Sequence, residues 1–247
     1  DLHFPDDLIN QCALEALKLN EESTSEVRSI VPTFDERVLP EDSVLITSLD
    51  TIPDKLVPVL EYLIDRKIYL DDYAFYWTPK VGFSNRVIIP FTYNNKIVGY
   101  TARAISDAKP KYISEQQPGY VFNLDSQHDD REFTIVCEGP FDAISIDGCA
   151  LLGAEIKDSQ NWLLKQLGKE IVLVPDRDHE GPRTVEQAIE YGWSVSMPDW
   201  PDGVKDVNDA VVKLGRLTTL WLIVSAKESN ALKIQLRAKK WFKDNNE

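Results

Sequence analysis

Hydrophobic and polar positions follow two different rhythms along the chain, and the rhythm changes near residue 130. Before that point, residues 8–20 and 56–67 carry apolar side chains at helical spacing, so each segment predicts an amphipathic helix. Residues 85–105 instead hold two runs rich in β-branched and aromatic side chains, separated by the turn sequence YNNK. Such a pattern is typical of an antiparallel hairpin.

Beyond residue 130, short apolar runs such as FTIVC and EIVLV alternate with helical segments of about ten residues. Strands that are apolar throughout are buried on both faces, which predicts a parallel sheet flanked by helices. The fold class expected is therefore mixed α/β. The pattern divides the chain into an N-terminal helical or adaptor region (1–79), a small β-rich subdomain (80–128), the α/β unit (129–215) and a basic helical tail (216–247).

Acidic residues follow the apolar runs of the second half. They are Glu138 after one run, Asp176 and Asp178 after a second, and Asp206 with Asn208 and Asp209 after a third. The strands of an open parallel sheet end at one edge, so we expect these acids to converge there. Taken alone, the residues also allow a plainer interpretation, in which Glu138 ends a strand at the surface and Asp142 complements a helix dipole.

Converging carboxylates repel one another unless a cation neutralises them. Oxygen ligands without His or Cys favour Mg²⁺ or Mn²⁺. The three Cys and three His of the chain lack the spacing of zinc ligands, so no zinc is expected. The sequence also lacks the glycine-rich phosphate loop, the dinucleotide fingerprint and the nucleophile elbow. The chemistry that remains after these exclusions is a metal-assisted reaction at phosphate groups.

The 247-residue chain has a net charge of −14, which by itself argues against a nucleic-acid partner. The distribution of charge changes this picture. Residues 80–112 carry six Lys and Arg against one Asp, and residues 213–243 carry eight against one Glu. Basic segments beside an acidic one favour a track for phosphates next to a cation site. Exposed, solvated lysine faces are the alternative for both segments.

The N-terminal sequence shows no signal-peptide pattern, and no apolar run approaches the ~18 residues of a membrane span. A cytoplasmic protein without a membrane partner is therefore expected.

Two motifs connect the acids to a known family. EGPFDA at 138–143, followed by VPDRDHEG at 174–181, resembles the paired signatures of the topoisomerase/primase (Toprim) domain. The preceding segments RVIIPF, IVGYTARAI and KPKYIS are similar, in order and spacing, to the β-rich subdomain of bacterial and phage replicative primases, most closely the phage branch. The resemblance covers about residues 80–215. It implies a DNA primase, an RNA polymerase that uses ribonucleoside triphosphates and Mg²⁺ or Mn²⁺ to start short primers on single-stranded DNA.

The resemblance also implies roles for individual residues. Metal binding or catalysis falls to Glu138, Asp176, Asp178 and Asp206, with Asp142 and Asn208 in support. Asn208 stands where the family has an acid, which weakens one possible ligand. Contacts to template or incoming nucleotide fall to Arg86, Arg103, Lys109 and Lys111.

Several of these residues have structural alternatives. Arg103 could pair with Asp107, and Lys111 could cover the sheet. Tyr100, Tyr112 and Tyr120 could stack on bases, or could pack within the hairpin.

Two other functions use the same motifs. A Toprim nuclease would cleave RNA or DNA with these acids, although it does not need the basic block before them. A non-catalytic nucleic-acid or replisome-binding module would not need the acids. A replicative helicase is an expected partner on another chain, and the zinc module of replicative primases has no counterpart in this sequence. The tail could close over the template, dock a helicase or pack on the Toprim unit.

Overall fold

The computed structural model describes residues 32–127 and 130–243. The helix predicted over 8–20 lies outside these residues. From Phe34 onward the described residues belong to one compact unit. Within the described ranges, no helix combines the length and the apolar character that crossing a membrane requires.

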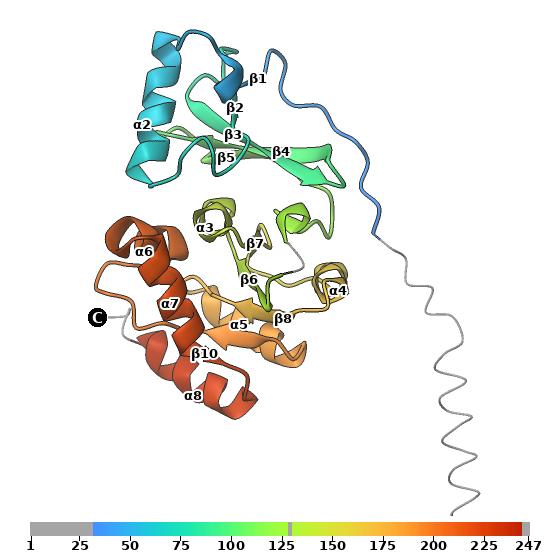
Figure 1. Ribbon diagram of the computed structural model, residues 1–247, viewed down its shortest axis with the longest axis vertical. Helices are drawn as coiled ribbons and strands as arrows, with labels where there is room; N and C mark the ends of the chain where they lie inside the picture. Colours follow the sequence, from blue (N-terminus) through green and yellow to red (C-terminus); the bar gives the residue numbers. More distant parts are fainter. Residues whose placement is uncertain (1–31, 128–129, 244–247) are drawn as a thin grey trace, which may run out of the picture. The chain divides into compact units, whose positions relative to one another are not determined.

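The first half of this unit is built on an antiparallel sheet of five strands in spatial order β1 to β5 (Figure 1). The strands are Val44–Leu45 (β1), Tyr76–Trp77 (β2), Arg86–Tyr93 (β3), Lys96–Ala104 (β4) and Tyr112–Glu115 (β5). The predicted hairpin is β3–β4. Asn94 and Asn95 both have positive φ, and their amides donate to the carboxylate of Asp125. Asparagine tolerates this left-handed backbone, so the hairpin prediction is confirmed.

Helix α2 (Val57–Asp65) is the predicted helix of residues 56–67. Its buried Val59 and Leu63 belong to the same hydrophobic cluster as Phe91 on β3. Strands β1 and β2 also come from the region expected to be helical, and they extend the antiparallel sheet. Each strand has two residues, which is too short to produce a readable alternation of polar and apolar positions.

The second half of the unit is built on a sheet with strand order β10-β9-β8-β6-β7. Its strands are Phe133–Cys137 (β6), Cys149–Ala150 (β7), Glu170–Leu173 (β8), Ser194–Ser196 (β9) and Lys227–Glu228 (β10). Strands β6 to β9 are parallel, and β10 is antiparallel to β9. The helices are Pro140–Ile146 (α3), Asp158–Gln166 (α4), Gly181–Glu190 (α5), Val207–Leu214 (α6), Arg216–Ala226 (α7) and Ala231–Trp241 (α8). Short 3₁₀ helices span Ile46–Ser48, Asp54–Leu56 and Leu124–Ser126.

The order of the parallel strands creates a switch point between β6 and β8. From β6 the chain passes through α3 to β7 on one side, and from β7 it returns through α4 to β8 on the other side. Right-handed crossovers therefore place α3 and α4 on opposite faces, as Figure 1 shows. Ligands of open α/β sheets bind beyond the carboxyl ends of the strands at such a point.

The C-terminal tail packs on the α/β unit, which is the third of the roles expected for it. Ile223 of α7 and Ile234 and Trp241 of α8 are buried in the core of the parallel sheet. The tail is not purely helical, because β10 lies between α7 and α8 and covers the edge of β9. This strand also has two residues. It is too short to show an alternation of polar and apolar positions between the helical patterns on either side, so it could not be predicted from the sequence.

Candidate active site

The first two acids meet because β6 and β8 are neighbouring parallel strands. Glu138 directly follows β6, and Asp176 lies three residues beyond the end of β8. The Val174 amide donates to the Val136 carbonyl (2.9 Å), which extends the pairing past the end of β8. The Asp176 amide then donates to Glu138 Oε1 at 3.4 Å. The convergence at the switch point that the sequence predicts is therefore present for this pair.

Asp142 and Asp206 come from the helices beside the strand ends. Asp142 lies in the first turn of α3, after Pro140, which is well suited to the start of a helix. Asp206 is the N-cap of α6 and accepts from the Asp209 amide at 2.7 Å. The two helices pack together, and Asp142 Oδ1 accepts from the Asn208 amide of α6 at 2.8 Å.

We call the cluster of Glu138, Asp142, Asp176 and Asp206 the acidic edge. Its carboxyl groups influence one another's ionisation. Burial raises the pKa of Glu138 to about 7, and the charge of Asp178 adds to the rise. Burial also raises the pKa of Asp176, with further contributions from Asp142 and the other acids of the cluster. The pKa values of Asp142 and Asp206 are raised as well, again chiefly by burial. Without a cation, the cluster therefore holds protons near neutral pH.

Asp178 occupies a different position. Its side chain is exposed, and Oδ1 accepts from the amides of Glu180 (2.9 Å) and Gly181 (3.1 Å) at the start of α5. A Cβ at Gly181 would lie 2.3 Å from the Asp176 carbonyl oxygen, so only glycine lets this helix approach the acidic edge so closely. The segment Asp176–Asp178, which we call the DxD segment, is thus held in place by hydrogen bonds to the start of α5.

The donor set fits a hard divalent cation, because several carboxylates with raised pKa values share one edge and only oxygen ligands are offered. The ligands are not yet gathered around one point. Within the described ranges, no three His, Cys, Asp or Glu side chains lie close enough to hold an ion. A bound cation would therefore have to draw these carboxylates together.

Lys111, directly before β5, lies near the acidic edge, and Arg103 at the end of β4 lies near Lys111. The charge of Arg103 is the main factor that lowers the pKa of Lys111, while Asp206 raises it, so Lys111 lies within electrostatic range of both. The Arg103 guanidinium lies 4.6 Å from the ring centroid of Tyr112, and no ion pair of Arg103 with Asp107 occurs among the described residues. Lys109 is exposed in the preceding turn.

Arg86 does not join this group. It is 4% exposed, and its guanidinium donates to the carbonyl oxygens of Gly82 (3.0 Å), Ala102 (3.2 Å) and Pro110 (2.7 Å). A contact with nucleic acid would require Arg86 to leave these acceptors. The structure instead gives Arg86 the task of holding the turn that carries Lys109 and Lys111.

Tyr100, Tyr112 and Tyr120, the three tyrosines considered for base stacking, also differ in burial. Tyr120 is 1% exposed and stacks on Phe91 in the core at 5.2 Å, so it is a packing residue. Tyr100 is half-buried on β4. Tyr112 is 42% exposed beside Arg103, which leaves its ring accessible to a base.

Arg66 is the residue of this site that the sequence analysis did not identify. It follows α2, and its guanidinium contacts the rings of Tyr62 (4.9 Å) and Phe141 (5.1 Å). Its charge partly offsets the rise in the pKa values of Asp142 and Asp206 that burial causes. Its Nη1 donates to Asn208 Oδ1 at 2.6 Å, across 142 positions of sequence. No local spacing could have revealed this contact.

Asn208 is fully engaged by this arrangement. Its Nδ2 donates to the Arg66 carbonyl (3.0 Å) and to Ser145 Oγ (2.8 Å), while Oδ1 accepts from Arg66. An amide satisfies all these contacts because it is a donor at one end and an acceptor at the other. Asn208 therefore joins α3, α6 and Arg66, and both ends of its side-chain amide are engaged in these contacts.

A family model described as Toprim-like matches residues 135–211. The matched residues, called the Toprim-like domain below, contain most of β6, all of β7 to β9 and the acids that follow these strands. The resemblance to Toprim domains inferred from the two motifs is thus confirmed, and so is the mixed α/β fold.

The chain is similar to bacterial DNA primases. It is 29% identical over 163 residues to the DNA primase of Clostridium acetobutylicum, with 58% of this chain and 27% of that protein covered. It is 30% identical over 156 residues to the DNA primase of Rickettsia bellii, with 54% and 26% covered. The chain therefore spans about a quarter of the length of these relatives.

Two solved primase structures share the fold. The E. coli primase catalytic core aligns with a TM-score of 0.61 at 18% identity, covering 76% of this chain and 79% of that one. The zinc-binding and RNA polymerase domains of the Aquifex aeolicus primase align with a TM-score of 0.51 at 24% identity, covering 72% and 50%. The likeness extends beyond the Toprim-like domain, since both alignments cover more of the chain than residues 135–211.

Proposed function

We propose that this chain is a DNA primase, which synthesises short RNA primers on single-stranded DNA by nucleotidyl transfer. The observation that carries the proposal is that Lys111 lies within electrostatic range of Arg103 and of Asp206, one of the acids of the acidic edge. Nucleotidyl transfer needs both parts, because anionic phosphates must be held next to a site that binds cations. The similarity to DNA primases supports the same activity.

Glu138, Asp176, Asp178 and Asp206 would hold Mg²⁺ or Mn²⁺. When bound, such a cation would supply positive charge that stabilises the charge developing on the reacting phosphate. Burial raises the pKa of Glu138 in the metal-free protein, and a bound cation would favour the ionised carboxylate that serves as its ligand. Lys111, together with Arg103, would hold phosphates of the template or of the incoming ribonucleotide, contacts that position a strand without reading its sequence.

The proposal is tested by incubating the chain with single-stranded DNA, labelled ribonucleotides and Mg²⁺ or Mn²⁺. We expect oligoribonucleotides from the wild type. Glu138→Gln and Asp176→Asn should each lower synthesis by at least about 100-fold, the effect of removing a group that stabilises charge in the transition state. The matched controls Glu61→Gln and Asp50→Asn, at exposed positions of the first half, should retain synthesis.

The other outcomes separate the alternatives. Degradation of the template, with no RNA product, would indicate a Toprim nuclease. Binding of the strand without either product would indicate a non-catalytic module. Synthesis retained in both Glu138→Gln and Asp176→Asn would show that the acidic edge is not the catalytic centre.

A further inference from the structure

A groove of about 810 Å³ lies on the C-terminal side of the Toprim-like domain, between the loop 197–203 and helices α7 and α8. We call it the tail groove. Its lining includes Arg177, Trp200, Trp221, Arg237, Lys240 and Trp241. None of these residues belongs to the acidic edge or to the basic residues near β5.

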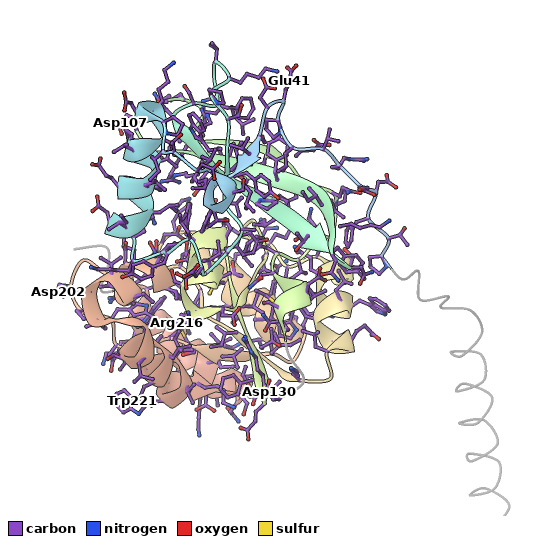
Figure 2. The ribbon with its side chains drawn as sticks, turned by 45° about the horizontal axis from the view of Figure 1, so that its top comes forward. Glu41, Asp107, Asp130, Asp202, Arg216 and Trp221 are labelled. Carbon is purple, nitrogen blue, oxygen red and sulfur yellow. The ribbon has the colours of Figure 1, made fainter. Side chains whose placement is uncertain are left out.

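The lining combines cations with an accessible indole. Trp221 is 65% exposed on α7, where Figure 2 places it on the outer side of the C-terminal helices. Arg237 and Lys240 are exposed on α8, and no described carboxylate forms an ion pair with Lys240. Trp200 is 5% exposed, and its indole N–H has no hydrogen-bond partner among the described residues. The groove therefore offers two exposed cations and one accessible aromatic face, and the buried Trp200 contributes to its wall.

The tail groove begins where the DxD segment of the acidic edge ends. Arg177 lies between Asp176 and Asp178, and its amide donates to the Lys205 carbonyl at 2.7 Å. Its Nε donates to the Trp241 carbonyl at 3.2 Å, and its guanidinium lies 5.4 Å from the Trp241 ring centroid. One residue therefore connects the backbone of the acidic edge to the wall of the groove.

We propose that the tail groove binds single-stranded DNA, namely the stretch of template that extends beyond the acidic edge. This inference rests on the function proposed above. Cations along α8 match phosphates, and the exposed face of Trp221 matches a base, since aromatic platforms with basic side chains bind single strands without sequence preference. Asp199 and Asp202 of the loop 197–203 also line the groove, and their carboxylates could accept hydrogen bonds from base amino groups.

The first test measures binding alone. Fluorescein-labelled oligothymidylates of about 6 to about 24 nucleotides span the site sizes of single-strand grooves and are titrated into the full chain without ribonucleotides. We expect affinity to rise with length. Arg237→Gln/Lys240→Gln should remove this rise and reduce the salt slope by about 1.4, or about 0.7 for each lost phosphate contact. The double variant Lys55→Gln/Lys165→Gln, at exposed sites outside the groove, should behave like the wild type.

Trp221→Ala should weaken binding of the long strands by at least about fivefold, because the stacking platform is lost. Trp221→Phe should restore most of the affinity. Leu217→Ala is the matched control, because Leu217 is 82% exposed one turn earlier on α7 and does not line the groove. Long strands that bind Arg237→Gln/Lys240→Gln and Trp221→Ala as tightly as the wild type would overturn the inference.

Two further measurements distinguish failure of this inference from failure of the proposed function. RNA synthesis on templates too short to reach the groove should be unchanged in the groove variants, while Asp176→Asn should lose it. If the wild type makes no RNA but binding of long strands still depends on Trp221 and Arg237, the proposed function fails and the groove assignment stands. A labelled glutamate-rich helical peptide that binds through these residues, when oligothymidylates do not, would overturn the assignment in favour of a protein interface.

Discussion

Arg86 and Lys111 show how the surroundings of a side chain determine what its charge can do. Arg86 lies buried among carbonyl oxygens at the start of β3, whereas Lys111 is exposed beside β5. The sequence shows both as basic residues of one block and could not separate them, because a strand pattern does not reveal which charged residue is buried. Burial lowers the pKa of Arg86, yet an arginine remains charged in proteins.

The two residues should therefore respond differently to substitution. Lys111→Ala should weaken single-strand binding and reduce the salt slope by about 0.7, with little change in the free energy of unfolding. Arg86→Gln should lower the free energy of unfolding by roughly 3 kcal/mol, because buried carbonyl oxygens lose their donors. Salt-dependent anisotropy and urea denaturation measure the two effects. A large salt effect in Arg86→Gln, with stability intact, would return Arg86 to the nucleic-acid contacts.

At the scale of elements, the parts predicted correctly are those whose signal is local. The hairpin β3–β4 follows from its two asparagines, and the alternation after residue 130 follows from runs long enough to show their period. Strands of two residues, such as β2 and β10, carry no such signal. The contacts of Asn208 on α6 with α3 and with Arg66 also could not be predicted. Ser145 of α3 is 63 positions from Asn208, and Arg66 is 142 positions away.

The hydrogen bonds of Asn208 to Ser145 and Arg66 can be tested by substituting Asn208. If Asn208 replaced a metal ligand, Asn208→Asp would strengthen metal binding. We expect it instead to lower the free energy of unfolding by about 1–3 kcal/mol, because Ser145 Oγ and the Arg66 carbonyl lose their donor. Asn208→Ala should cost a similar amount. The measurement is urea denaturation with and without Mn²⁺, and tighter Mn²⁺ binding by Asn208→Asp would contradict the structural assignment.

At the scale of the whole molecule, the acidic edge connects stability to pH and to metal. Glu138 has a pKa of about 7 in the folded protein against 4.5 for a free glutamate, and the pKa of Asp176 is also raised. The folded state therefore binds more protons than the unfolded state between these values. The stabilisation is complete below the unfolded pKa and is lost as pH rises through the folded pKa.

Without divalent cations, thermal stability should consequently fall as the pH rises from about 5 towards about 8, with each group contributing up to about 1.4 kcal/mol per pH unit. Mg²⁺ should reverse the loss at the upper end, because it replaces protons in the cluster. Asp176→Asn should flatten the pH dependence and raise the stability of the metal-free protein. Melting temperatures with EDTA and with Mg²⁺ provide the test, and a metal-free stability that rises over this range would contradict it.

The edge strand β10 has a practical consequence for anyone who shortens this chain. The family motifs end near residue 215, which makes a fragment stopping there an obvious choice for expression. Such a fragment would leave the hydrogen-bonding edge of β9 unpaired and remove Ile223 and Trp241 from the core. Unpaired strand edges recruit other chains and promote aggregation. The smallest soluble domain therefore has to extend through Trp241.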